Sequence, residues 1–155
     1  MNVVQAERLP LEPQVAAHAD EMFTVLSDPA SYEHENEPPP SPEWLRERFE
    51  WLEGRTSPDG KEQWLNWVIR LPSSELIGYV QATVYRDGRA SIAYELNSRY
   101  WSQGLASEAV RVMVDALVQQ YRVRRIGAVL KRDNLRSLRL LQRLGFSPAL
   151  PDAHG

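Results

Sequence analysis

The sequence predicts one α/β domain built on a mixed sheet, and three observations lead to this fold class. Asp87 and Gly88 lie between two runs of alternating polar and apolar residues, which is a strong signal for an antiparallel hairpin. A helical pattern over residues 105–121 separates the strand expected at 89–97 from an apolar run at 123–131. Such a crossover places two strands of one sheet in parallel. The length of 155 residues suits a single domain, over residues 1–155, with a sizeable core.

Two helices are expected before the sheet. The first stops before Pro29, and its apolar residues near helical spacing are Val15, Ala16, Met22, Phe23 and Leu26. The second follows a proline-rich loop at 36–42, with Ser41 as its N-cap and Pro42 at the first helical position. Its apolar stripe consists of Trp44, Leu45, Phe49 and Leu52. This stripe is either core packing or a wall over a substrate cleft, and the sequence leaves both interpretations open.

Three strands with short links are expected over residues 62–71, 75–86 and 89–97, which predicts an antiparallel meander. The first places Leu65, Trp67 and Ile69 on one side. The run at 123–131 is expected to be a strand buried on both faces. A last helix follows Asn134, with Gly145 as its C-cap. The leucines expected to point inward from it are Leu138, Leu141 and Leu144.

Composition excludes several classes of protein. The net charge of −3 argues against a nucleic-acid binder. The absence of cysteine excludes disulfides, thiol catalysis and cysteine metal sites, and the three histidines have no ligand spacing, so no metal is expected. No apolar run is long enough to cross a membrane, and the first residues show no signal-peptide core. We therefore expect a cytoplasmic protein without a membrane partner.

The segment YWSQGLASEAV, residues 100–110, places small residues directly before a helix. The first N–H groups of a helix have no partner within it, and small side chains let an anion approach them. A pyrophosphate fits such a site, although a glycine at this place is often only cap geometry. The segment is neither a P-loop nor a dinucleotide fingerprint, because the further residues of those motifs are absent.

Several motifs in the second half of the chain belong to one pattern. It consists of Tyr94 and Leu96, then Trp101, Gly104, Ala106, Ser107, Glu108 and Ala109, then Asn134 and Ser137, and finally Leu144, Gly145 and Phe146. This pattern resembles the GNAT superfamily of acetyltransferases, and most closely its RimJ/RimL-like branch. The resemblance is specific over residues 90–147 and looser upstream.

The resemblance implies a GNAT-type fold: a mainly antiparallel sheet with a splayed parallel strand pair, flanked by helices. It implies acetyl-CoA as donor and a primary amine as acceptor, joined by direct attack through a tetrahedral intermediate. Leu96 matches the position whose N–H stabilises the oxyanion, Asn134 should hold the pantetheine arm, and Ser137 should reach the sulfur. One or two of the arginines beside the expected cofactor should meet the 3′-phosphate, and the others should form a solvated helix face; these are Arg132, Arg136, Arg139 and Arg143. The implied cofactor-binding residues are Leu96, Ser102, Gln103, Gly104, Leu105, Ala106, Ser107, Asn134, Arg136 and Ser137.

Two departures from the pattern bear on the chemistry. Ser102 stands where the family has the first glycine of a pair, which keeps the N–H but loses backbone freedom. Leu141 stands where many members have a tyrosine that protonates the leaving thiolate, and Ser137 is expected in that role. Glu95 is the candidate base, with a solvated or salt-bridged strand carboxylate and ordered water as the alternatives. Tyr94 and Glu108 are expected to be structural.

Three functions stay open on the sequence. The first is an N-acetyltransferase for a peptide or protein α-amine or a small amine. The second is the same chemistry on an aminoglycoside or polyamine, which the acidic loop of Glu33, Glu35 and Glu37 would suit. The third is a non-catalytic acyl-CoA-binding module.

The end of the sequence departs from the family as well. The family follows its Gly-Phe with two antiparallel strands, whereas nine residues follow Phe146 here, so the C-terminal strand region is expected to be shortened. The edge at 128–131 should then pair with residues 146–150 or with a second copy of the chain in a homodimer. A shortened end would also leave the acceptor cleft open on one side.

Overall fold

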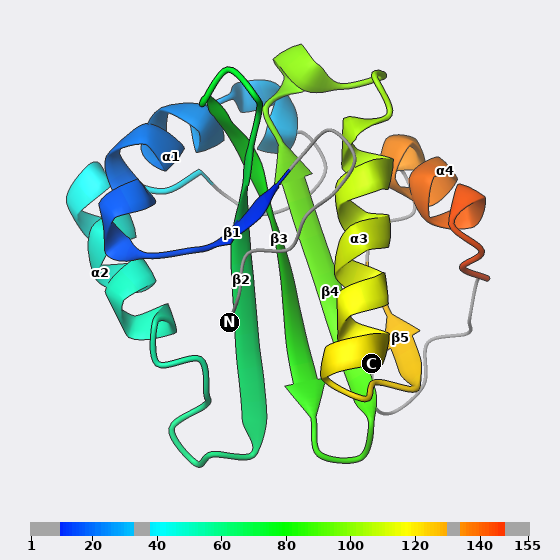
Figure 1. The fold of residues 1–155 in the computed structure, drawn as a ribbon. Helices are drawn as coiled ribbons and strands as arrows, with labels where there is room; N and C mark the ends of the chain where they lie inside the picture. Colours follow the sequence, from blue (N-terminus) through cyan, green and yellow to red (C-terminus); the bar gives the residue numbers. More distant parts are fainter. Residues whose placement is uncertain (1–9, 33–37, 130–133, 148–155) are drawn as a thin grey trace.

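A five-stranded sheet forms the centre of the computed structural model, which describes residues 10–32, 38–129 and 134–147 (Figure 1). The strands are β1 (Leu11–Pro13), β2 (Glu62–Arg70), β3 (Leu76–Tyr85), β4 (Arg89–Leu96) and β5 (Arg125–Gly127), and they lie in this order across the sheet. The first four run antiparallel to their neighbours, whereas β4 and β5 are parallel. The predicted mixed sheet with one parallel pair is confirmed.

The helices cover both faces of the sheet. Helices α1 (Ala19–Leu26) and α2 (Pro42–Leu52) lie on one face, and α3 (Leu105–Gln120) and α4 (Leu135–Arg143) on the other (Figure 1). Short 3₁₀ turns precede and follow α1, at Ala16–His18 and Pro29–Tyr32, and a third at Ser98–Tyr100 links β4 to α3. No helix among the described residues has the length and apolarity that a membrane crossing requires.

Strand alternation divides the core into two parts. Leu65, Trp67 and Ile69 of β2 all belong to the cluster that packs under α3 and α4, as the alternation predicts. Val68, between them, belongs to the cluster under α1 and α2. Residues directly opposite each other on antiparallel strands share a face, so the register extends this division across β3 and β4.

The N-terminal half of the chain follows the predicted pattern with three differences. The Ser41 hydroxyl accepts the Trp44 N–H at 3.0 Å, so the predicted N-cap is confirmed. Val15 lies before α1 and is exposed, because the chain there forms the approach to a 3₁₀ turn. Strand β1 was not predicted, since a three-residue strand with a proline at its end carries no periodic signal. Of the predicted stripe, Leu45 is buried whereas Trp44 is 46% exposed.

The C-terminal half requires two corrections. The run at 123–131 is not a strand buried on both faces: β5 is a three-residue edge strand in which Arg125 is exposed, and Val129 beyond it is 84% exposed. In α4 the buried leucines are Leu140 and Leu141, while Leu138 is half-buried, because Ser137 takes the buried position one turn earlier. Gly145 follows the helix with φ 94°, as the C-cap prediction requires. The predicted pairing of residues 146–150 with 128–131 falls largely outside the described residues.

Candidate active site

The parallel pair separates before β4 ends. Its register runs from Arg89 opposite Arg125 to Ser91 opposite Gly127, whereas β4 continues to Leu96. Within the described residues, the parallel pairing with β5 therefore covers only the first part of β4. This is the splay that the resemblance implies.

Leu96 presents its peptide groups to the outer edge of β4. The Asn97 N–H donates to the Ile77 carbonyl of the neighbouring strand at 2.9 Å, and successive residues of a strand point their peptide groups to opposite edges. The indole N–H of Trp101 donates to the Leu96 carbonyl at 3.0 Å, which agrees with this direction. The position predicted to stabilise an oxyanion thus faces the splay.

Gly78 of β3 makes this arrangement of β4 sterically possible. It lies opposite Leu96 in the register. A Cβ atom on Gly78 would stand 2.1 Å from the Glu95 carbonyl oxygen and 2.9 Å from the Leu96 Cα. Both neighbours are backbone atoms that cannot rotate away, so β4 can approach β3 this closely only because residue 78 has no side chain.

The start of α3 is open toward solvent and rich in small residues. Gly104 is its N-cap with φ 76°, and Ser102 also adopts a left-handed conformation, with φ 63°. In the described ranges of the chain, the N–H groups of residues 102–107 donate to no protein acceptor. A helix of 16 residues also adds the positive end of its dipole at this place. These groups fit the pyrophosphate of a nucleotide cofactor, which needs several converging N–H donors.

Asn134 and Ser137 come together at the start of α4. The Asn134 Oδ1 accepts the Ser137 N–H at 3.3 Å, and both residues are buried. The Tyr94 hydroxyl donates to the Ser137 carbonyl at 3.5 Å, so α4 is held against the face of β4 that packs under α3. Tyr94 is half-buried and packs on the core, which agrees with a structural role. Because the cap uses Oδ1, any hydrogen bond from Asn134 to a ligand carbonyl would come from its Nδ2 group.

Arg136 stacks on Trp101, with its guanidinium carbon 3.6 Å from the ring centroid. The predicted phosphate ligand is therefore also the cation above the indole that holds the end of β4. Sequence reasoning assigned Trp101 only to a motif and missed this contact. An aromatic residue shortly after a strand, and an arginine in a helix that packs beside it, give no local signal for such a pair.

Asp28 ties the end of α1 to the segment after β4. Its carboxylate accepts the Ser98 N–H at 2.6 Å and the Ala30 N–H at 3.1 Å. Burial alone raises the pKa of Asp28, but these hydrogen bonds and the nearby Arg136 charge outweigh it and lower the pKa overall. The Asn97 side chain adds a bond of 3.1 Å to the Val25 carbonyl. Both ties cross from one layer of helices to the loop that leads into α3.

Glu95 lies on the opposite face of β4 from Tyr94, as alternation predicts. It is 8% exposed and stands directly across from Tyr79 of β3, which belongs to the face under α1 and α2. Ser137 packs on the other side of the sheet. The structure therefore does not gather all predicted catalytic residues on one face: Glu95 and Ser137 flank β4 from opposite sides, with the peptide edge at Leu96 between them.

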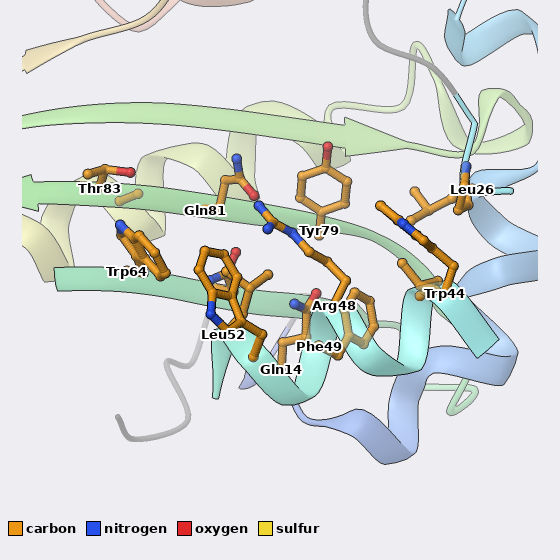
Figure 2. Close-up of a pocket in the computed structure, with 15 residues that line it drawn as sticks. Gln14, Leu26, Trp44, Arg48, Phe49, Leu52, Trp64, Tyr79, Gln81 and Thr83 are labelled. Atoms are coloured by element: carbon orange, nitrogen blue, oxygen red, sulfur yellow. The ribbon is translucent and has the colours of Figure 1, made fainter. Parts of the chain in front are cut away.

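A cavity of about 530 Å³ lies between α2 and the sheet face of β2 and β3 (Figure 2). Its walls include the whole predicted stripe on α2: Leu45 and Phe49 are buried in the core, which confirms the core-packing interpretation, and the four residues together line the cavity. A role of this wall in substrate binding stays a prediction. The floor is polar, with Asn66, Gln81 and Thr83 from the two strands. Sequence reasoning missed these three, although polar residues alternating with core residues on the same strands were the available signal.

Three further predictions concern Glu108, a metal site and the acidic loop. Glu108 is buried in the first turn of α3, where a carboxylate is favourable beside the helix dipole, which fits its expected structural role. No cluster of three or more potential metal ligands occurs among residues 10–32, 38–129 and 134–147. The acidic loop with Glu33, Glu35 and Glu37 lies outside the described residues.

Comparisons with known proteins agree on one family. The family model of the acetyltransferase (GNAT) domain matches residues 8–147. An uncharacterized N-acetyltransferase, p20 of Bacillus licheniformis, is 28% identical over 149 residues, which cover 94% of this chain and 83% of the relative.

Two solved structures share the fold over most of both chains. A ribosomal L7/L12 α-N-protein acetyltransferase, RimL, in complex with coenzyme A has a TM-score of 0.80 at 17% identity, covering 94% of this chain and 84% of its own. A ribosomal-protein-S5-alanine acetyltransferase of Vibrio fischeri has a TM-score of 0.77 at 20% identity, covering 94% and 82%.

Proposed function

Because this chain belongs to the GNAT acetyltransferase family, we propose that it transfers the acetyl group of acetyl-CoA to the α-amine of a peptide or protein, or to a small primary amine. One observation carries the proposal. The register of β4 and β5 ends at Ser91, beside a helix whose first N–H groups donate to no acceptor in the described chain. A strand edge next to an open helix start suits a thioester on an extended arm with a pyrophosphate behind it.

Different residues of these elements bind different parts of acetyl-CoA. The N–H groups from Ser102 to Ser107 bind the pyrophosphate, with Gln103, Gly104, Leu105 and Ala106 contributing backbone rather than side chains. Asn134 donates to the pantetheine arm from its Nδ2 group. Arg136, held on Trp101, is the cation for the 3′-phosphate. Binding of the pyrophosphate by backbone N–H groups requires small residues at the start of α3 and does not require a cluster of basic side chains around it.

The chemistry needs a proton acceptor, an oxyanion donor and a proton donor. Glu95 takes the proton of the attacking amine, directly or through ordered water, which matters because an α-amine with a pKa of about 8 is mostly protonated at pH 7. The Leu96 N–H stabilises the oxyanion that forms as nitrogen attacks the thioester carbon. The C–N bond forms, the C–S bond breaks, and Ser137 passes a proton to the departing thiolate, whose pKa of about 8.5 makes this help modest.

The lining of the cavity bears on the choice of acceptor. Among the residues that the structure describes, none that lines it is acidic, and Arg48 brings a positive charge. A polycation such as an aminoglycoside would meet repulsion there. Both solved structures are named for ribosomal-protein acceptors, and RimL for an α-N-protein acetyltransferase, although their low identity extends only the fold to this chain.

The proposal is tested by release of free thiol from acetyl-CoA in the presence of four amine classes: peptides, amino acids, polyamines and aminoglycosides. We expect turnover with peptides or small primary amines and none without an acceptor. Calorimetric binding of CoA without turnover on any amine would instead support a non-catalytic acyl-CoA-binding module. Turnover confined to aminoglycosides or polyamines would contradict the proposed acceptor class.

A further inference from the structure

Two amide residues with little exposure, Gln14 and Asn66, line the cavity between α2 and the sheet. Gln14 is 4% exposed and Asn66 is 5% exposed, and both line the cavity. Their backbones are bonded: the Gln14 N–H donates to the Asn66 carbonyl at 2.9 Å. Their side-chain amides are therefore placed where they can meet an occupant of the cavity. Amide groups that line a cavity can donate to and accept from a polar occupant, so this floor suits a polar ligand.

The wall facing that floor combines a cation with aromatic rings. The Arg48 guanidinium lies 4.7 Å from the Trp51 ring centroid, and the Trp51 and Trp64 centroids are 4.6 Å apart. Figure 2 shows Arg48 extending from α2 over the cavity toward Gln81 of the sheet. Within the described ranges no carboxylate pairs with Arg48, and no residue lining the cavity is acidic. Trp44 and Trp51 are 46% and 50% exposed, which is unusual for residues of this size.

The position of the cavity relative to Glu95 sets the length of its occupant. In the register, Gln81 lies opposite Ala93, two residues before Glu95 on the neighbouring strand, and Asn66 lies one strand further away. With strands about 4.8 Å apart and a rise of about 3.3 Å per residue, Gln81 is about 8 Å and Asn66 about 12 Å from Glu95. An extended peptide covers this distance in about three residues.

We propose that this cavity recognises the third or fourth residue of a peptide acceptor, and that the residue recognised there is acidic. The inference rests on the proposed function, in which the acceptor amine lies at Glu95. The buried amides of Gln14 and Asn66 bind the peptide groups of the acceptor, Arg48 binds its carboxylate, and the tryptophans cover it. A free amino acid is too short to reach Arg48 from Glu95, because its carboxylate carbon lies only two bonds from its amine nitrogen. A polycation is disfavoured by the charge of Arg48.

The test uses two series of tetrapeptide amides, Ala-Ala-Xaa-Ala and Ala-Ala-Ala-Xaa, in which Xaa is Glu, Gln or Lys, with kcat/KM measured by thiol release. The acidic preference is expected in one of the two series. We expect the Glu peptide to exceed the Gln peptide by about tenfold, the usual effect of one charge-assisted contact, and to exceed the Lys peptide by more. Arg48→Gln should bring kcat/KM for the Glu peptide down to about that for the Gln peptide, so that the ratio between the two peptides, about tenfold in the wild type, falls to about one. Arg46→Gln is the matched control, since Arg46 is one half-turn away on α2 and pairs with Asp20 at 2.7 Å outside the cavity.

A second measurement separates the failure of this inference from the failure of the proposed function. Quenching of tryptophan fluorescence by the Glu peptide reports binding beside Trp44, Trp51 and Trp64 even when no acetyl transfer occurs. Turnover of peptides without an acidic preference, or with one that survives Arg48→Gln, would overturn the inference and leave the function intact. Arg48-dependent binding without turnover would overturn the function and leave the cavity as a binding site for acidic peptides. Absence of binding and of turnover would overturn both.

Discussion

Ser102 carries a backbone conformation that normally belongs to glycine. Its φ of 63° lies in the left-handed region, two residues before Gly104 at 76°. For a residue with a Cβ atom this conformation costs about 1 kcal/mol or more. The sequence has a serine where the family has a glycine, and the structure shows this serine in the left-handed conformation that glycine adopts most easily. This strain lies inside the segment proposed to bind pyrophosphate.

Replacing Ser102 by glycine should therefore stabilise the protein. We expect Ser102→Gly to raise the free energy of unfolding by about 0.5 to 1 kcal/mol, because relief of the left-handed strain exceeds the added entropy of the unfolded chain. Urea denaturation should show a higher midpoint with an unchanged slope. Ser107→Gly, inside α3, is the control and should destabilise by a similar amount. A loss of stability in Ser102→Gly would mean that the hydroxyl makes a contact worth more than the strain.

Glu95 is the residue on which the proposed proton transfer depends. Glu95→Gln keeps the size of the side chain but removes its proton-accepting form. We expect kcat/KM to fall by about 10²- to 10⁴-fold, the usual effect of a general base, and the acid limb of the pH–rate profile to flatten. Kinetics like those of the wild type in this variant would move the role to ordered water.

At the scale of the element, α3 is the helix whose start defines the donor site. Gly104 tolerates its φ of 76° at no steric cost, and among other residues asparagine and aspartate tolerate it best. The pair Gly104→Asn and Gly104→Asp therefore differs mainly in charge, with bulk and backbone cost nearly equal.

We expect Gly104→Asp to abolish calorimetric binding of CoA, because a carboxylate would stand where the pyrophosphate approaches. Gly104→Asn should bind at least about tenfold more tightly than the aspartate variant, since it adds bulk without the repulsion. Equal binding by both variants would show that bulk alone decides, and unchanged affinity in the aspartate variant would rule out the pyrophosphate site at this helix.

Strand β1 is attached to the sheet by a two-pronged ion pair. The Arg70 guanidinium donates to both carboxylate oxygens of Glu12, at 2.6 and 3.1 Å, and His18 lies 3.5 Å from the same carboxylate. The hydrogen bond from Arg70 is the main cause that lowers the pKa of Glu12 below its ordinary 4.5. Burial is the main cause that lowers the pKa of His18 below 6.5.

These two shifts predict how stability depends on pH. Both groups bind fewer protons when folded, so each stabilises the protein above its unfolded pKa and loses this contribution as the pH falls through its lowered value. Stability should therefore decline in two windows, below about pH 6.5 for His18 and below about pH 4.5 for Glu12. Glu12→Gln should cost about 1 kcal/mol at pH 7 and make the decline in the lower window shallower, while the lowered pKa of Asp28 keeps part of it. Because the Glu12 charge raises the pKa of His18, the variant should also lower that pKa further. Urea denaturation between pH 3 and 8 measures both effects, and a lower window as steep as in the wild type would contradict the assignment.

At the scale of the whole molecule, β4 divides the proposed reaction between two sides of the sheet. Glu95 belongs to the face under α1 and α2, and Tyr94 with its bond to Ser137 belongs to the face under α3 and α4. In the proposed reaction, the donor and acceptor would therefore approach one strand from opposite directions and meet at its outer edge near Leu96. Asp28 and Asn97 fix the distance between the two layers at this point.

The sequence predicts the layers of this molecule better than its cavities. Periodicity identified four strands and four helices because each of the long ones buries one face, as Leu65, Trp67 and Ile69 illustrate. It failed for β1, whose pairing with β2 joins residues more than fifty positions apart, and it overestimated β5, whose apolar run lies at an exposed edge. Family resemblance located Asn134 and Ser137. The cavity could not be predicted, since it depends on where α2 crosses the sheet. This crossing places Arg48 in the lining of the same cavity as Gln14 and Asn66.

Gly78 has a consequence for how the protein tolerates change. Since a Cβ atom there meets the backbone of Glu95 and Leu96, any substitution must displace the very strand proposed to carry base and oxyanion donor, while the neighbouring core under α3 stays intact. A saturation library can be scored once for cellular abundance and once for acetyl transfer. At this position the two scores should differ, because Gly78→Ala should keep much of its abundance and lose most of its activity. A core position such as Val110 should instead lose both together. Residue 78 would then stand out as a functional position although it offers no chemical group of its own.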